Sequence, residues 1–119
     1  MTIQPTPALT RDRPLAGRAA IVTGSTSGIG LGIARALAHA GADIVLNGLG
    51  DPVEIEQLRS DIEGAADVRI IYDAANLMDP AGAVAMVEHA ADMFGQVDIL
   101  VNNAGIQHVS PIMPCLAAT

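Results

Sequence analysis

A glycine-rich segment between an apolar run and a helical pattern constrains the fold of this chain more than any other feature. Residues 19–23 read Ala-Ala-Ile-Val-Thr, a short apolar run typical of a strand buried on both faces of a parallel sheet. Residues 24–30 follow as Gly-Ser-Thr-Ser-Gly-Ile-Gly, and Ile29, Ile33 and Leu37 then recur at helical spacing. This succession of strand, loop and helix restricts the chain to folds in which strands and helices alternate.

The same alternation continues along the chain. Further strands are predicted at residues 44–46, 68–72 and 97–101, and aspartate-proline pairs at 51–52 and 79–80 predict the starts of two more helices. Val84, Val87, Ala91 and Phe94 are expected to form the inward face of the last helix. No hairpin signal separates the strands, so right-handed crossovers should make the sheet parallel. The sequence predicts an α/β fold, the N-terminal half of a doubly wound Rossmann fold with four parallel strands and helices on both faces.

The glycines of the loop each suit a dinucleotide site. Gly24 can take the sharp turn off the strand, Gly28 lets the backbone approach a phosphate, and Gly30 allows close packing of helix on sheet. The pyrophosphate would sit on the helix N-terminus beside Ile29. The hydroxyls of Ser25, Thr26 and Ser27 would add donors, although a plain strand-to-helix turn is the alternative for such a segment.

A second motif, Asn102-Asn103-Ala104-Gly105, follows the fourth predicted strand. Its position, together with the Gly-x-x-x-Gly-x-Gly spacing, resembles the short-chain dehydrogenase/reductase family. The resemblance implies that Asn103, Ala104 and Gly105 lie beside a bound nucleotide. It also implies that Thr23 bonds the backbone near Ala104 and ties the first strand to the fourth.

Three stretches carry a narrower resemblance, to the D-3-hydroxybutyrate dehydrogenase group within this family: residues 23–34, 41–51 and 101–108. It covers about residues 15 to 112 and implies NAD-dependent interconversion of D-3-hydroxybutyrate and acetoacetate. Gln107 would hold the substrate carboxylate; a polar loop residue facing solvent is the alternative. The partner is then a small hydroxy acid, and members of the family usually form homotetramers through helices that this chain lacks.

Charge favours NAD over NADP as the cofactor. No arginine or lysine occurs between Arg35 and Arg59, the region where a cation would meet the 2′-phosphate of NADP. Leu49, with the neighbouring Asn47 and Gly48, is expected to line the adenosine by backbone and packing. Asp51 stands where a ribose-binding carboxylate could occur, but a helix N-cap is the favoured interpretation.

The adenine side departs from the family pattern. The family commonly has an aspartate and an aliphatic residue after the third strand, and here the position resembles Asn76-Leu77. An amide can still accept from the adenine amino group through its oxygen. Asp73 is a lesser candidate, and a solvated loop is the alternative for both Asn76 and Asp73.

The family's catalytic tyrosine, the lysine four residues later and the nearby serine have no counterpart in this sequence. The only tyrosine is Tyr72, inside a predicted strand, and the chain contains no lysine. The lysine normally lowers the tyrosine pKa so that the phenol can exchange the alcohol proton as hydride leaves. We therefore assign no catalytic residue and expect the chain alone to be inactive. Another short-chain dehydrogenase with a different hydroxy or keto substrate, or a non-catalytic nucleotide-binding module, are the alternatives.

Composition narrows the partners and compartment. Thirteen acidic and six basic residues give a net charge of −7, which disfavours nucleic acid and anionic membranes. A single cysteine argues against disulfides and thiolate metal sites, so no metal is expected and a cytoplasmic location is favoured. We expect residues 1–17 to be a disordered leader, 18–112 the NAD-binding unit and 113–119 a tail outside the resemblance. The fourth strand should then leave an open sheet edge.

Overall fold

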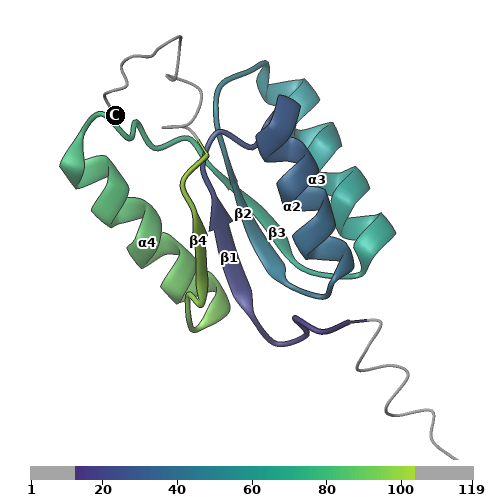
Figure 1. The fold of residues 1–119 in the computed structure, drawn as a ribbon. Helices are drawn as coiled ribbons and strands as arrows, with labels where there is room; N and C mark the ends of the chain where they lie inside the picture. Colours follow the sequence, from purple (N-terminus) through teal and green to yellow (C-terminus); the bar gives the residue numbers. More distant parts are fainter. Residues whose placement is uncertain (1–12, 104–119) are drawn as a thin grey trace, which may run out of the picture.

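The computed structural model describes residues 13–103, in which strands and helices alternate as predicted (Figure 1). The elements in chain order are β1 (Ala19–Val22), α2 (Gly28–His39), β2 (Asp43–Asn47), α3 (Pro52–Ala66), β3 (Ile70–Asp73), α4 (Pro80–Phe94) and β4 (Ile99–Val101). β3 and β4 begin two residues later than predicted. An aspartate side chain accepts a backbone hydrogen bond just before each strand. Before β3, Asp43 accepts from Arg69 N at 2.9 Å; before β4, Asp98 accepts from Ala19 N at 2.9 Å.

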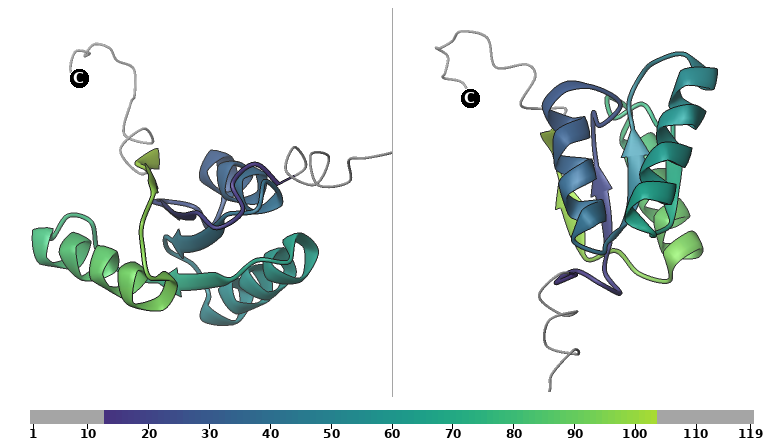
Figure 2. Two further views of the ribbon diagram at one scale, coloured as in Figure 1. Left: turned by 90° about the horizontal axis from the view of Figure 1, so that it is seen from below. Right: turned by 90° about the vertical axis from the view of Figure 1, so that its right-hand side faces the viewer.

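The four strands form one parallel sheet in the order β3-β2-β1-β4. Ile21 of β1 lies opposite Val45 of β2 and Leu100 of β4. Helices α2 and α3 cover one face of the sheet and α4 covers the other (Figures 1 and 2). The predicted fold class is therefore confirmed. From β1 to β3 each new strand is added on one side of β1, whereas β4 is added on the other side. Ligands of doubly wound folds bind at the carboxyl ends of the strands where the strand order reverses in this way.

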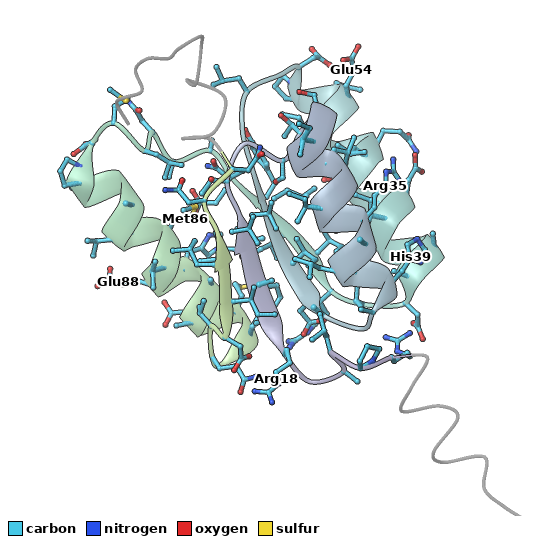
Figure 3. All side chains as sticks on the ribbon, in the orientation of Figure 1. Arg18, Arg35, His39, Glu54, Met86 and Glu88 are labelled. Atoms are coloured by element: carbon cyan, nitrogen blue, oxygen red, sulfur yellow. The ribbon has the colours of Figure 1, made fainter. Side chains whose placement is uncertain are left out.

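The two ends of the sheet carry different groups. Because all strands are parallel, Arg18 before β1 lies at the amino end of the sheet, and Glu54 in the first turn of α3 lies at the carboxyl end (Figure 3). Asp51 accepts a hydrogen bond from Glu54 N at 3.0 Å, and Asp79 accepts one from Ala81 N at 3.0 Å. The two predicted helix caps are thus present, and both helices begin at the carboxyl end.

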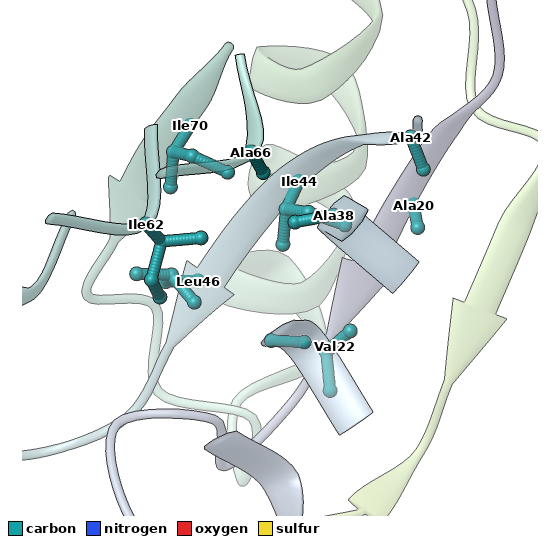
Figure 4. Close-up of a cluster of buried hydrophobic side chains, with 10 residues drawn as sticks. Ala20, Val22, Ala38, Ala42, Ile44, Leu46, Ile62, Ala66 and Ile70 are labelled. Carbon is teal, nitrogen blue, oxygen red and sulfur yellow. The ribbon is translucent and has the colours of Figure 1, made fainter. Parts of the chain in front are cut away.

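The larger part of the core lies between the sheet and helices α2 and α3 (Figure 4). Ala34 and Ala38 face the sheet from α2, and their small side chains let this helix approach closely. On the opposite face, Met86 and Ala90 of α4 pack on Ile21 and Val45.

The predicted inward face of α4 is wrong for three of its four residues. Val84 is 57% exposed and Val87 is 43% exposed, and Ala91 is also exposed. Helix α4 carries two apolar stripes, and the sheet contacts the one that contains Met86 and Ala90. Periodicity alone cannot distinguish two such stripes.

A turn precedes the sheet, within the part assigned above to a leader. Leu15 N donates to Ala40 O at 2.8 Å, and the Arg13 guanidinium donates to Ala66 O and Asp67 O at 3.0 and 3.2 Å. Residues 13–17 therefore pack against the C-terminal ends of α2 and α3, while residues 1–12 lie outside the described residues. No helix within residues 13–103 has the length and hydropathy that a membrane span requires.

Candidate cofactor-binding site

The glycine-rich loop leaves β1 in a conformation that suits glycine. Gly24 and Gly28 both have φ near +60°, the left-handed region that side chains disfavour. A Cβ on Gly30 would lie 2.1 Å from the carbonyl oxygen of Gly24 and 2.5 Å from Nδ2 of Asn103. Helix α2 therefore packs directly on the loop. Backbone conformation favours glycine at positions 24 and 28, and the close approach of the helix favours glycine at position 30.

The first turn of α2 is open toward the carboxyl end of the sheet. Its N-cap, Ser27, is extended and makes no side-chain cap hydrogen bond, and Ser27, Gly28 and Ile29 are exposed. A Cβ on Gly28 would meet nothing within 4 Å among the described residues. Amide donors and the positive end of the helix dipole therefore face an accessible space, which fits an anionic pyrophosphate.

Two of the three candidate hydroxyls are used within the protein. Ser25 is completely buried, and its Oγ accepts from Asn47 N at 3.0 Å. Thr26 Oγ1 donates to Leu49 O at 2.8 Å. Both hydroxyls brace the loop, which leaves Ser27 as the hydroxyl most accessible to a ligand.

The end of β4 closes the other side of the loop. Thr23 N donates to Val101 O at 3.0 Å, and Thr23 Oγ1 lies 3.3 Å from both Val101 O and Asn102 Oδ1. Asn103 is buried; its Nδ2 donates to Gly24 O at 3.0 Å, while its Oδ1 is buried with no hydrogen-bond partner among residues 13–103. Within the described residues, Thr23 thus links the first strand to the fourth through Val101 and Asn102. Ala104, Gly105 and Gln107 lie outside the described residues.

The loop after β2 presents one large apolar side chain, because Leu49 is 92% exposed. Its backbone is held on both sides: Tyr72 donates its phenolic O–H to Gly48 O at 2.5 Å, and Thr26 holds the carbonyl of Leu49. A Cβ on Gly48 would lie 2.5 Å from Thr26 Oγ1. This loop is therefore a braced platform, with Leu49 available for contact with a ligand.

The acidic candidates have structural partners. Asp51 is the N-cap of α3, as favoured from the sequence. Asp73 accepts from Ala75 N at 2.8 Å and pairs with His89 Nδ1 at 2.8 Å, which ties β3 to α4. Asp73 is thus occupied in holding the fold.

The adenine-side candidates lie in the loop between β3 and α4. Asn76 is exposed, and its Oδ1 accepts from Met78 N at 3.0 Å, while Leu77 packs partly on the core beneath α4. Asn47, which is expected to line the adenosine by backbone and packing, is only 3% exposed. A polar residue at the end of an apolar strand could have signalled this burial, because such a group must find hydrogen-bond partners.

Comparison with known proteins identifies the family of this chain. A sequence model described as short chain dehydrogenase matches residues 18–117. The chain belongs to the short-chain dehydrogenase family. The family match extends to residue 117, five residues beyond the boundary expected at 112, and the family binds nicotinamide cofactors.

Two similar members of the family are D-beta-hydroxybutyrate dehydrogenases. The chain is 48% identical over 95 residues to the protein of Rhizobium meliloti (strain 1021), covering 80% of the chain and 37% of the relative. It is 50% identical over 99 residues to that of Cupriavidus necator, covering 82% of the chain and 37% of the relative. The chain thus spans little more than a third of these curated relatives.

A solved member of the family has a similar structure. It is the L-sorbose reductase of Gluconobacter frateurii, complexed with NADPH and L-sorbose, with a TM-score of 0.67 and 36% sequence identity. The match covers 75% of this chain and 34% of the reductase. The described part of this chain therefore has a fold similar to about a third of a solved short-chain dehydrogenase.

Proposed function

We propose that this chain is the cofactor-binding part of an NAD-dependent dehydrogenase that converts D-3-hydroxybutyrate to acetoacetate. The observation that carries the proposal is the open first turn of α2, where Gly28 leaves room for close approach and Ser27 makes no cap bond. Anions bind such helix N-termini through backbone N–H groups and the helix dipole. The likeness to the two D-beta-hydroxybutyrate dehydrogenases supports the substrate.

Each part of the cofactor has candidate residues in this chain. The N–H groups of residues 28–30 and the Ser27 hydroxyl would hold the pyrophosphate, and Leu49, Asn76 and Leu77 would contact the adenosine. Asn103, Ala104 and Gly105 would lie on the nicotinamide side. Bound NAD would supply the acceptor for the hydride that leaves the alcohol carbon.

The distribution of arginines supports NAD over NADP. Arg18 and Arg69 pair with Asp98 and Asp43 at the amino end of the sheet, and Arg59 donates to Ile70 O at the start of β3. Arg13 lies at the same end, on the C-terminal ends of the helices. The loop after β2 offers the apolar Leu49 and then Asp51, which would repel a 2′-phosphate.

A nucleotide titration tests the cofactor proposal. We expect AMP and NAD to perturb amide resonances of the glycine-rich loop, and we expect 2′,5′-ADP to bind at least about ten-fold more weakly than AMP, a difference of about 1.4 kcal/mol. Leu49→Arg should reverse this preference, because it adds a cation at an exposed position. Tighter binding of 2′,5′-ADP to the unmodified chain would contradict the choice of NAD.

Proton transfer is the part of the reaction that this chain does not provide. Its one tyrosine, Tyr72, uses its phenolic O–H in a hydrogen bond to Gly48 O, and there is no lysine in the sequence to activate a phenol. We expect the purified chain with NAD and D-3-hydroxybutyrate to produce no NADH above the background rate. Turnover in this fluorescence assay would refute the proposed inactivity.

Translation of the coding DNA beyond codon 112 in every frame tests the substrate. A serine strand followed by Tyr-x-x-x-Lys would indicate a longer enzyme, and that enzyme should oxidise D-3-hydroxybutyrate. A preference of the longer enzyme for another alcohol would favour a different short-chain dehydrogenase, as the reductase of L-sorbose illustrates. Absence of the motif would favour a non-catalytic nucleotide-binding module.

A further inference from the structure

A buried amide at the end of β2 connects two loops of the candidate site. Asn47 is 3% exposed and follows a run of fully buried apolar residues. Its Nδ2 donates to Asp73 O at 2.9 Å and to Ala75 O at 3.2 Å, and its Oδ1 accepts from Gly24 N at 3.3 Å. Both amide hydrogens and the oxygen are therefore satisfied, as burial demands.

The orientation of this amide follows from its neighbours. Two carbonyl oxygens can only accept, and the Gly24 N–H can only donate, so the nitrogen and oxygen of the Asn47 side chain cannot exchange places. The Asn47 backbone adds a second link: its carbonyl accepts from Ser25 N at 2.6 Å. Asn47 thus accepts hydrogen bonds from the first two residues of the glycine-rich loop, Gly24 and Ser25.

The contacts of Asn47 belong to a chain of hydrogen bonds across the carboxyl ends of all four strands. Asn103, after β4, holds the carbonyl of Gly24, which follows β1. Asn47, at the end of β2, holds the N–H of Gly24 and the carbonyls of Asp73 and Ala75 after β3. Movement of the glycine-rich loop relative to the loop after β3 would break at least one of these bonds.

We propose that Asn47 is a positioning residue that couples the pyrophosphate-binding loop to the adenine-binding loop, so that the two loops become ordered together. This inference rests on the proposed function, because it assigns those two loops to two parts of one cofactor. Asn47 itself is buried and acts through Gly24 and Ala75. A ligand that orders one loop should lower the cost of ordering the other, which appears as positive coupling between two ligands.

The unmodified chain provides the first test. Inorganic pyrophosphate and adenosine are titrated separately and together, and amide resonances of residues 24–30 and 75–77 report the two sites. We expect saturating adenosine to tighten pyrophosphate binding about five-fold, the lower end of typical coupling between sites. Equal pyrophosphate affinity with and without adenosine would overturn the proposal.

Asn47→Asp provides the second test, because this near-isosteric change keeps an acceptor for Gly24 N and replaces the donor by an oxygen facing two carbonyls. We expect the coupling between adenosine and pyrophosphate to disappear, and hydrogen exchange to accelerate at Gly24 and Ala75 together. Gln57→Glu is the matched control, since it makes the same chemical change on the exposed face of α3. Core amides of Ile21 and Val45 report any general loss of stability.

The outcomes separate this inference from the proposed function. If neither probe nor NAD binds, the proposed function fails, and exchange at Gly24 and Ala75 in Asn47→Asp still reports whether the residue links the loops. Acceleration in one loop alone would refute that link. If Asn47→Asp does not fold, the coupling measured in the unmodified chain provides the result.

Discussion

The contact between Gly30 and the loop beneath it makes Gly30→Ala the most informative stability variant. The new Cβ would lie 2.1 Å from Gly24 O and 2.5 Å from Asn103 Nδ2. Neither neighbour can easily move, because Gly24 and Asn103 bond each other and Asn47 holds Gly24 from the other side. The substitution therefore forces α2 away from the sheet or breaks this network.

The magnitude follows from two opposing effects. Overpacking of a tight site costs about 1–3 kcal/mol, and loss of the bond between Asn103 and Gly24 adds about 1 kcal/mol. Replacement of a helical glycine by alanine returns about 1 kcal/mol through reduced backbone entropy. We expect Gly30→Ala to lower the free energy of unfolding by about 1–3 kcal/mol.

Gly32→Ala is the matched control, two residues further along the same helix. A Cβ there meets nothing within 4 Å among the described residues, so only the helix propensity changes. We expect it to raise the free energy of unfolding by about 0.5–1 kcal/mol. The same chemical change should thus have opposite effects at the two positions.

Urea unfolding followed by far-ultraviolet circular dichroism measures both variants, and thermal melts give a second reading. A difference of 1 kcal/mol corresponds to a shift of about 4–8 °C in Tm for a domain of about 100 residues. Equal stability of Gly30→Ala and Gly32→Ala would refute the reasoning, because it would mean that α2 does not rest on Gly24.

Three further predictions concern pH, a helix cap and the open sheet edge. Hydrogen bonds from Ile70 N to Glu63 and from Ala19 N to Asp98, together with nearby arginines, lower the pKa of both carboxyls. The folded state therefore binds fewer protons than the unfolded state in acid. We expect the full contribution of these carboxyls to the free energy of unfolding above about pH 5, and a progressive loss of that contribution as the pH falls. Glu63→Gln should flatten that profile, and an unchanged acid slope would count against it. Asp51→Ala should cost about 1 kcal/mol of stability by chemical denaturation while AMP affinity stays the same, whereas a loss of affinity would assign Asp51 to the ribose. The edge of β4, which no strand within residues 13–103 pairs and where Leu100 is 62% exposed, should make the chain self-associate or bind hydrophobic dye at micromolar concentration. Leu100→Lys should reduce both; a sharp monomeric melt of the unmodified chain would contradict this.

Local chemistry made much of the fold predictable from the sequence. The aspartate caps of α3 and α4 bond amides two or three residues away, so a short segment contains all the information required. The separate roles of Gly24 and Gly30 follow in the same way from a strand that must turn directly into a helix. The order of apolar runs and helical patterns then predicts a parallel sheet, because parallel strands need crossovers.

The tertiary structure alone decided which polar groups remain available to a ligand. Ser25 and Thr26 look like free donors in the sequence, but their partners are Asn47 at the end of β2 and Leu49 in the loop after it, 22 and 23 residues away. The sequence does not show which partners Asn47 has; in the structure its side chain is buried and bonds to Gly24, Asp73 and Ala75. Periodicity tells which side chains share a face, whereas only the assembled sheet determines which of two apolar stripes on α4 is covered. The physical reason is that a hydrogen bond or a packed contact depends on distance in space, and residues remote in the chain meet only once the strands have paired.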